Sequence, residues 1–399
     1  MRALEYAPTI PGYAAARLLG GTRGGPLGLL RLNHRAAPPR PGSGWSRVRP
    51  RLAGICGSDL AAIGGHASTY LGALSTTPFV PGHEVVGDLV EDSRELTAGT
   101  RVIIEPLLRC AVRGVPPCAR CAAGEEQGCE AVAGEGMDAG LQTGYCGATG
   151  GGWGTELWAH ADQLHAVPAT LDDREAVLVE PLACAVHAAL RSGVGPGDRV
   201  LVLGAGTVGL LTLAALSHLA PPGRLLAVAK HDHQRRLAEQ LGADSVTAPG
   251  SALRAVRWLT GARLVEPRIG DPFLLGGVDV TLECTGTAAG LQQALACTRA
   301  GGTVVMVGMP GRLTVDLAPA WHREISLRGA YGYGSETVEG IVRRTFAIAL
   351  ELASSLALGR LVGAPHPLSG YREALAEASS AGARGLVKVV FAPQHTEAA

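Results

Sequence analysis

The residues best suited to chemistry lie in the stretch from Cys56 to Glu84. Cys56 offers a thiolate and His83 an imidazole, and Asp59 and Glu84 place a carboxylate near each. Zinc takes sulfur, nitrogen and carboxylate ligands, and a catalytic zinc has three protein ligands and one open position. Glu180 is the candidate for the third ligand. Taken alone, such a pair is more often a buried thiol and a structural imidazole, so this interpretation depends on the motifs that follow.

A second set of cysteines predicts a structural metal site. The set is Cys110, Cys118, Cys121 and Cys129, of which the last three have the spacing C-x2-C-x7-C. Four thiolates match a closed zinc site built entirely from cysteine. The alternative is an irregular loop with free thiols. The separation between Cys110 and Cys118 requires a longer loop than a tight zinc knuckle.

A glycine-rich turn after an apolar strand predicts a dinucleotide-binding site. Val200–Leu203 is continuously apolar, as in a strand buried on both faces of a parallel sheet. It runs into the sequence Gly-Ala-Gly-Thr-Val-Gly at 204–209, and then into an apolar helix expected over Leu210–Leu219. In this strand–GxGxxG–helix order the glycines allow a tight turn and bring a pyrophosphate close to the helix N-terminus.

The residues at the end of the strand that follows the glycine-rich turn indicate which nicotinamide cofactor is bound. An NAD-selective site places Asp or Glu about 20 residues or somewhat more beyond the glycines, where it holds the ribose diol. The strand expected over Arg224–Ala229 is followed instead by Lys230 and His231. A cation suits a 2′-phosphate, so NADP(H) is favoured over NAD(H); the alternative is a solvated lysine and loose selectivity. The candidate cofactor-binding residues are Gly204, Gly206, Thr207, Val208, Gly209, Lys230, His231 and Thr285.

Composition and charge narrow the class of protein. The 399 residues are 47% hydrophobic, which suits two or three domains. Lysine plus arginine equals aspartate plus glutamate, 35 each, and this balance argues against nucleic acid or a membrane surface as partner. No apolar run approaches the ~20 residues that cross a bilayer, and we expect no signal peptide. Nine cysteines then predict metal ligands and core thiols in a cytoplasmic protein.

The pattern of elements predicts an α/β chain that is divided into two domains. Short strands with Gly and Pro breaks predict a small β-barrel-like domain in residues 1–182, with the cysteine lobe at about 106–135. Strands and helices alternate over 183–331, which predicts a doubly wound parallel sheet. The tail, 332–399, is too small to fold alone, so we expect it to pack on the first domain.

Some segments carry specific expectations. Asp172–Ser192 has a helical pattern that Pro181 should break or kink. Ala14–Leu32 is expected to form two strands and a turn, and Val338–Leu358 a helix. The glycine-rich stretch Gly144–Gly154 is expected to be a flexible loop near the site, where its tryptophan is either a pocket wall or ordinary packing.

Together these motifs resemble the zinc-dependent medium-chain dehydrogenase/reductase family, specifically its polyol and threonine dehydrogenase-like branch. The resemblance covers essentially the whole chain. It rests on the four cysteines and on Gly54–Asp59, Gly82-His83-Glu84, Glu105-Pro106, Glu180-Pro181-Leu182, Gly204–Gly209 and Glu283-Cys284-Thr285-Gly286. It implies a GroES-like catalytic domain and a Rossmann domain with the active site between them. It also implies homodimers or homotetramers joined partly through the Rossmann edge strands.

The resemblance also implies roles for the candidate metal residues. Cys56, His83 and Glu180 correspond to catalytic zinc ligands. Glu84 corresponds to an exchangeable or outer carboxylate, and Asp59 to a residue that orients a ligand, as metal-binding histidines commonly require.

Ser58 corresponds to the hydroxyl that accepts the substrate proton. Family members often carry a histidine five residues after the first cysteine to pass that proton to solvent, whereas this chain has Ala61, so His66 or water would serve instead. The implied reaction is hydride transfer between a nicotinamide and a small secondary alcohol, polyol, sugar or cyclitol, with zinc lowering the pKa of the substrate hydroxyl.

Two alternatives remain open. One is a metal-independent enoyl- or quinone-type reductase on the same scaffold, which the complete set of Cys56, His83 and Glu180 disfavours. The other is a non-catalytic nucleotide-binding protein, which the intact ligands, glycines and Ser58 disfavour.

Overall fold

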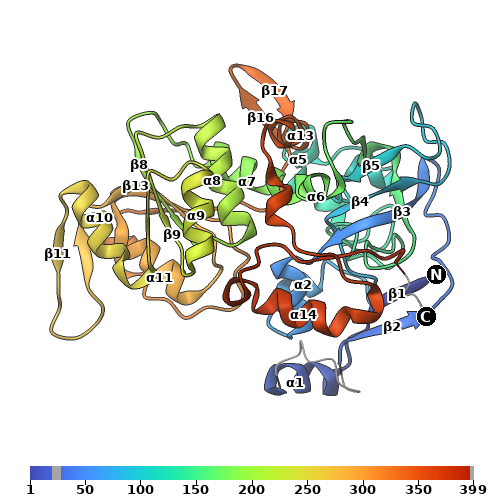
Figure 1. Ribbon diagram of the computed structural model, residues 1–399, viewed down its shortest axis with the longest axis horizontal. Coiled ribbons are helices and arrows are strands. Elements are labelled where there is room, and N and C mark those ends of the chain that lie inside the picture. The colour runs from blue at the N-terminus through green and yellow to red at the C-terminus, as the bar shows by residue number, and fades with distance from the viewer. Residues whose placement is uncertain (20–27, 396–399) are drawn as a thin grey trace. The chain divides into compact units, whose positions relative to one another are not determined.

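The computed structural model describes residues 1–19 and 28–395, which form two compact units (Figure 1). One unit contains Met1–Glu180 together with Gly334–Ala399, and the other contains Pro181–Tyr333. The structure confirms the expected class, a curled antiparallel sheet of the GroES-like type and a parallel Rossmann-like sheet in a mixed α/β chain.

The first unit is built on a sheet of six strands in the order β18-β3-β4-β5-β7, with β6 also paired to β3. Its neighbours are all antiparallel. The strands are β3 (Trp45–Gly54), β4 (Val85–Leu89), β5 (Arg101–Ile104), β6 (Leu157–His160), β7 (Leu164–Ala166) and β18 (Val390–Phe391). The unit also has two two-stranded sheets: β1 (Arg2–Tyr6) pairs with β2 (Leu30–His34), and β16 (Ser335–Val338) forms a hairpin with β17 (Ile341–Arg344).

The helices of this unit are short. They are α1 (Ile10–Leu19), α2 (Gly57–Ile63), α3 (Thr69–Gly72), α4 (Cys110–Arg113), α5 (Ala119–Ala122), α6 (Asp173–Ala176), α13 (Thr345–Ser355) and α14 (Tyr371–Ser379). The C-terminal tail joins the sheet directly, because β18 pairs with the end of β3 through Val390–Gly54 and Phe391–Ala53.

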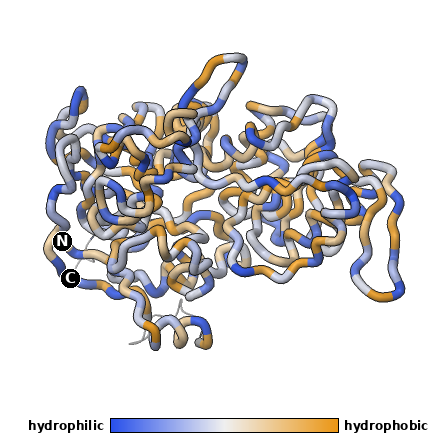
Figure 2. Tube along the Cα trace, turned by 180° about the vertical axis from the view of Figure 1, so that it is seen from behind, coloured by the Kyte–Doolittle hydropathy of each residue, from blue (hydrophilic) through white to orange (hydrophobic). Residues whose placement is uncertain are grey.

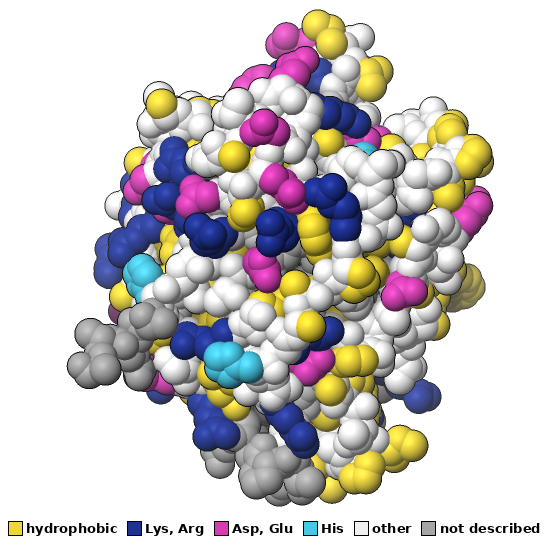
Figure 3. Space-filling model, turned by 90° about the vertical axis from the view of Figure 1, so that its right-hand side faces the viewer, with side chains coloured by type: hydrophobic (Ala, Val, Ile, Leu, Met, Phe, Trp, Pro, Cys, Tyr) yellow, Lys and Arg dark blue, Asp and Glu magenta, His cyan; other side chains and the backbone are white. Residues whose placement is uncertain are grey.

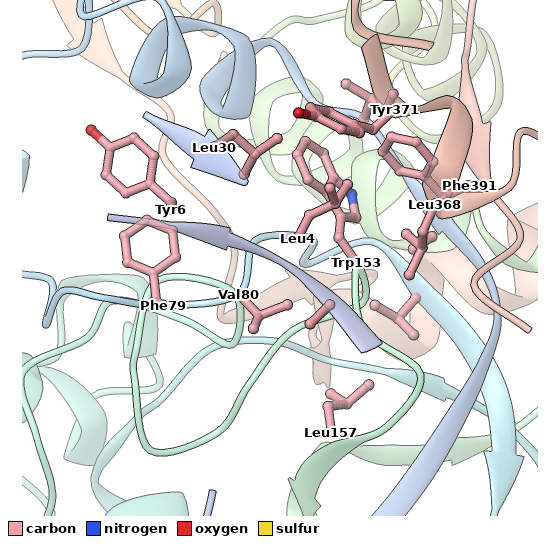
Figure 4. Packing of buried hydrophobic residues seen from close by; sticks show 14 of the residues in the cluster. Leu4, Tyr6, Leu30, Phe79, Val80, Trp153, Leu157, Leu368, Tyr371 and Phe391 are labelled. Carbon is pink, nitrogen blue, oxygen red and sulfur yellow. The ribbon is translucent and has the colours of Figure 1, made fainter. Parts of the chain in front are cut away.

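Aromatic side chains from the C-terminal tail and from the glycine-rich loop at 144–154 pack together in one hydrophobic core (Figure 4). Trp153 is fully buried and its indole N–H donates to Gly54 O at 3.0 Å. Its ring packs edge-to-face on Phe391, with centroids 5.1 Å apart. Such pairs add about 0.5–1.5 kcal/mol beyond the area they bury. Trp153 is therefore a core residue and not a pocket wall.

The stretch from 144 to 154 is closely packed and is not the flexible loop expected from its composition. A Cβ on Gly151 would lie 2.0 Å from Val80 O, and Gly152 donates its amide to Gly82 O at 2.8 Å. The glycines therefore allow two backbone segments to touch. This contact fixes the segment that carries His83.

The second unit is a six-stranded, all-parallel sheet in the order β10-β9-β8-β13-β14-β15. Its strands are β8 (Arg199–Leu203), β9 (Arg224–Val228), β10 (Ser245–Thr247), β13 (Val278–Glu283), β14 (Thr298–Met306) and β15 (Ser326–Gly329). The strand order reverses between β8 and β13, and ligands of doubly wound sheets bind at such a point.

Helices connect these strands, and one hairpin interrupts the alternation. The helices are α7 (Val179–Arg191), which spans the boundary between the units, α8 (Thr207–Leu219), α9 (Asp232–Gln240), α10 (Ala252–Thr260), α11 (Ala288–Cys297) and α12 (Ala318–His322). The hairpin is β11 (Arg263–Val265) with β12 (Phe273–Leu275). The apolar α8 is buried along most of its length, as the sequence predicts.

Two local predictions are wrong in part. Residues 10–19 form helix α1 instead of a strand, because Ala14–Arg17 is a run of strong helix formers; residues 20–27 of that prediction lie outside the described residues. Residues 338–344 belong to the hairpin, since Glu339 and Gly340 both have positive φ and form its two-residue turn. The helical pattern over Asp172–Ser192 is broken just before Pro181, as expected: α6 ends at Ala176 and α7 begins at Val179, which places Pro181 in a first turn, where proline is tolerated.

The surface carries charges of both signs. Figure 3 shows basic side chains beside acidic ones on one face. Among the ion pairs of the described residues, Arg51 and Arg101 both pair with Asp173. Over the described part of the chain, no helix has the length and apolar character needed to span a membrane.

Candidate active site

The site begins where β3 ends and α2 starts. Cys56 is the N-cap residue of α2, and its amide donates to Asp59 Oδ2 at 2.9 Å. A carboxylate in the first turn suits a helix N-terminus, so Asp59 holds the backbone of Cys56 in place. Asp59 is buried, and this burial raises its pKa, while the charge of His83 opposes the rise.

His83 approaches the same carboxylate from the other side. It follows Gly82, whose φ of +97° and close contact with Trp153 leave no room for a side chain. The Nδ1 atom of His83 lies 3.7 Å from Asp59 Oδ1, which leaves Nε2 for a metal. Burial alone would lower the pKa of His83, but Asp59, Cys56 and Glu180 raise it to about 10.

The structure gathers a metal-binding donor set at this point. Donor atoms of Cys56, His83 and Glu84 all lie within 4.8 Å of one another. A thiolate, an imidazole and a carboxylate are the ligand types of a catalytic zinc, so the residues present fit the metal that the sequence implied. Glu180, at the second position of α7, lies outside this group of three, yet its charge raises the pKa of His83.

Lys388 is a site residue that sequence reasoning missed. Its ammonium is buried, forms an ion pair with Glu84 and donates to Ile55 O at 3.3 Å. Burial alone would lower the pKa of Lys388, but the Glu84 and Cys56 charges outweigh it and raise the pKa. One signal was visible: Lys388 is one of two lysines in the chain and interrupts an apolar strand. It balances the charge of Glu84, which would otherwise be costly to bury.

The cysteine lobe forms a second donor set. The Sγ atoms of Cys110, Cys118, Cys121 and Cys129 all lie within 4.8 Å of one another. The residues between Cys110 and Cys118 are taken up by α4 and a left-handed turn at Gly114, so the long spacing does not keep the thiols apart. Backbone hydrogen bonds lower the pKa of Cys118 to about 6. These thiols fit a structural zinc.

The glycine turn in the second unit fits a dinucleotide. A Cβ on Gly209 would lie 1.8 Å from Gly204 O, so close packing of α8 on β8 requires glycine there. A Cβ on Gly206 would meet no atom within 4 Å, so this side of the turn is open to a pyrophosphate. Thr207 and Val208 form the first turn of α8. Thr285 borders Gly204, and its amide donates to Glu283 at 2.7 Å.

Basic side chains gather after β9. Lys230 is exposed, and His231 is the N-cap residue of α9. The ring of His231 stacks on that of His233, with centroids 5.9 Å apart. Arg235 donates to Ala229 O and Lys230 O and pairs with Asp232, so it braces this turn. Sequence reasoning missed His233 and Arg235, although their spacing along the first turns of α9 was visible.

Comparison with known proteins gives matches to both units. Residues 42–169 match the alcohol dehydrogenase GroES-like domain, and residues 207–347 match the zinc-binding dehydrogenase family. L-idonate 5-dehydrogenase of Vitis vinifera is 29% identical over 358 residues, covering 86% of this chain and 87% of that protein. Sorbitol dehydrogenase of Arabidopsis thaliana is 29% identical over 354 residues, with the same coverage of each chain.

A solved structure agrees with these matches. A zinc-binding dehydrogenase from Sinorhizobium meliloti 1021, determined with NADP bound, superposes with a TM-score of 0.71 at 25% sequence identity. The match covers 98% of this chain and 99% of that one.

Zinc uptake at the Cys56–His83 site should depend on pH through His83. A metal-bound imidazole must be neutral, whereas the pKa of His83 in the metal-free protein is raised to about 10. Below that pH the proton must leave when zinc binds, so zinc affinity should increase by up to about tenfold per pH unit over the neutral range. Competition titrations with a chromophoric chelator would measure this. His83→Gln should reduce the pH slope by about one proton, and an unchanged slope would contradict the assignment.

Proposed function

We propose that this chain, which belongs to the zinc-dependent medium-chain dehydrogenase/reductase family, is an alcohol dehydrogenase. It interconverts an alcohol and its carbonyl compound by hydride transfer with a nicotinamide cofactor. The observation that carries the proposal is the convergence of Cys56, His83 and Glu84 at the start of α2. Family membership supplies the context in which such a donor set works on a CH–OH group.

The proposed substrate is a polyol, sugar, cyclitol or other secondary alcohol. Support comes from the relatives, whose names describe dehydrogenases of idonate and sorbitol. A panel of such alcohols, assayed with both nicotinamide cofactors, would identify the substrate class.

The residues of the first unit have separate roles in this proposal. Cys56 and His83 hold the zinc with one of the carboxylates Glu84 and Glu180. Zinc, when bound, lowers the pKa of a substrate hydroxyl or polarises a carbonyl. Ser58, in the first turn of α2, accepts the substrate proton. The four-cysteine lobe holds a structural zinc.

Replacing a proposed zinc ligand should abolish turnover and spare nucleotide binding. Cys56→Ser or His83→Ala removes a donor from the site, and we expect alcohol oxidation to fall by about three orders of magnitude or more. NADP+ affinity, measured by calorimetry, should stay within about twofold. Cys146→Ser, which alters a buried thiol in the same unit, is the matched control and should retain activity.

The same assay separates the proposal from its alternatives. Full activity of the Cys56→Ser protein without zinc would contradict the proposal and favour a metal-independent reductase. The absence of turnover with every alcohol in the panel, despite bound zinc and nucleotide, would favour a non-catalytic nucleotide-binding protein.

We propose that NADP(H) is preferred over NAD(H). Support comes from the turn after β9, which lacks a carboxylate at the position that would bind the ribose diol and instead carries the exposed Lys230 and the half-buried His231. Arg235 holds this turn through the carbonyls of Ala229 and Lys230. The Lys230 ammonium can thus meet a 2′-phosphate.

Lys230→Glu should therefore weaken NADP+ far more than NAD+. We expect about a tenfold or greater loss in NADP+ affinity, since an attractive contact becomes repulsive. Arg236→Glu makes the same charge change at an exposed position on the neighbouring helix α9 and should have little effect. Equal losses for both cofactors in Lys230→Glu would refute the preference.

We also propose a cytoplasmic homo-oligomer, dimer or tetramer. Nine cysteines without disulfides favour a reducing compartment. Strand β15 pairs on one side only among the described strands, all four of its residues are exposed, and Trp321 and Tyr331 nearby are exposed as well. An exposed strand edge beside exposed aromatic side chains suits pairing with a second copy. The β16–β17 hairpin, which projects in Figure 2 with exposed Ile341 and Val342, is a second candidate surface.

Leu327→Lys should weaken this assembly. A charge in the middle of β15 opposes edge-to-edge pairing, so sedimentation velocity should show a shift toward the monomer. Ile269→Lys, at an exposed position on the loop between β11 and β12, is the control and should sediment like the unaltered protein. Unchanged sedimentation of Leu327→Lys would contradict an interface at β15.

A further inference from the structure

A half-buried tyrosine, Tyr145, lies beside Asp59 at the site. Tyr145 belongs to the glycine-rich loop, and its hydroxyl donates to Asp59 Oδ1 at 3.2 Å. Its ring lies 5.2 Å from that of Phe79 and 5.7 Å from that of His83, measured between centroids. The ring contacts fix the phenol in position, so its hydroxyl has a defined place beside the first turn of α2.

Ser58 is the neighbour that lacks a defined partner. Its Oγ atom is buried and has no hydrogen-bond partner among the described residues. Burial and the Asp59 charge raise the pKa of Tyr145, whereas the Ser58 hydroxyl opposes this rise. A group that donates to a phenol oxygen lowers the phenol pKa, and an acceptor raises it. Because the Tyr145 hydrogen is donated to Asp59 Oδ1, the phenol oxygen is left as an acceptor for the Ser58 hydroxyl.

We propose that Tyr145 is a positioning residue for Ser58, an inference that rests on the proposed alcohol dehydrogenase function. With the Tyr145 hydrogen committed to Asp59, the phenol oxygen accepts from Ser58. The Ser58 hydrogen then points toward Tyr145, and its lone pairs face away, where they can accept from the hydroxyl of an alcohol.

This arrangement gives Ser58 a hydrogen-bond partner in a chain that has Ala61 where family members often carry a histidine. His66, the substitute considered from sequence, is exposed and follows the C-terminal end of α2, whereas Ser58 lies in the first turn of the same helix. Tyr145 instead reaches Ser58 from a different segment. It is also tied to Asp59, whose other oxygen holds the Cys56 amide, so one carboxylate aligns Ser58 and the metal site together.

The test is a double-mutant cycle on alcohol binding. The protein is loaded with cobalt(II) in place of catalytic zinc, and 2,2,2-trifluoroethanol is titrated while the visible spectrum is recorded. Tyr145→Phe keeps the ring and removes the hydroxyl, so we expect about a five- to tenfold weaker affinity, the loss typical of one hydrogen bond. Ser58→Ala should cause a similar loss, and the double variant should lose no more than Ser58→Ala alone.

Tyr6→Phe is the matched control. Tyr6 also packs on Phe79, at 4.9 Å between centroids, and its hydroxyl bonds to Ala62 O at the far end of α2 from Ser58. It should bind trifluoroethanol within about twofold of the unaltered protein. Cobalt content should be equal in all variants.

Each contrary outcome has a distinct meaning. Unchanged affinity in Tyr145→Phe, or losses that add in the double variant, would overturn the role of Tyr145 and leave the proposed function intact. Loss of cobalt from Tyr145→Phe alone would also overturn it, since the hydroxyl would then act on the metal ligands. If the cobalt spectrum of the unaltered protein did not change when trifluoroethanol was added, this result would overturn both the proposed function and this inference.

Discussion

The buried carboxylate of Asp59 is the contact on which the site depends. One oxygen accepts the amide of Cys56, and the other accepts the hydroxyl of Tyr145 and faces Nδ1 of His83. A charge this deeply buried is costly unless its partners satisfy it. Each partner of Asp59 also has a proposed role in the active site, because Cys56 and His83 offer metal donors and Tyr145 aligns Ser58. The contacts that satisfy the Asp59 carboxylate therefore also hold the site residues in position.

The fold brings these partners together from distant parts of the chain. Tyr145 is 86 residues from Asp59, and Lys388 is 333 residues from its acceptor at Ile55. The close contact between the glycine-rich loop and the segment before His83 fixes the position of the His83 imidazole. Pairing of β18 with β3 carries Lys388 to Glu84. Loss of tail packing should thus disturb the charge balance beside the metal donors as well as the core.

Local sequence patterns predicted what depends on local geometry. The Gly204–Gly209 turn was predicted together with its strand and helix, because backbone sterics and pyrophosphate approach restrict such a turn. The roles of Lys388 and Tyr145 could not be predicted, since neither belongs to a motif and both act through tertiary contacts. Helix α1 and the β16–β17 hairpin were misread because short apolar runs suit helix and strand alike, and a turn or a core decides between them.

The central claim is that Cys56 and His83 share one zinc ion in an alcohol dehydrogenase site. Anomalous diffraction at the zinc absorption edge, from crystals of protein loaded with zinc, tests it most directly. The account predicts one peak in contact with Cys56 Sγ and a nitrogen of His83, and a second peak among the four cysteines of the lobe. Zinc in the lobe alone, with no peak between Cys56 and His83 at full metal loading, would contradict the claim.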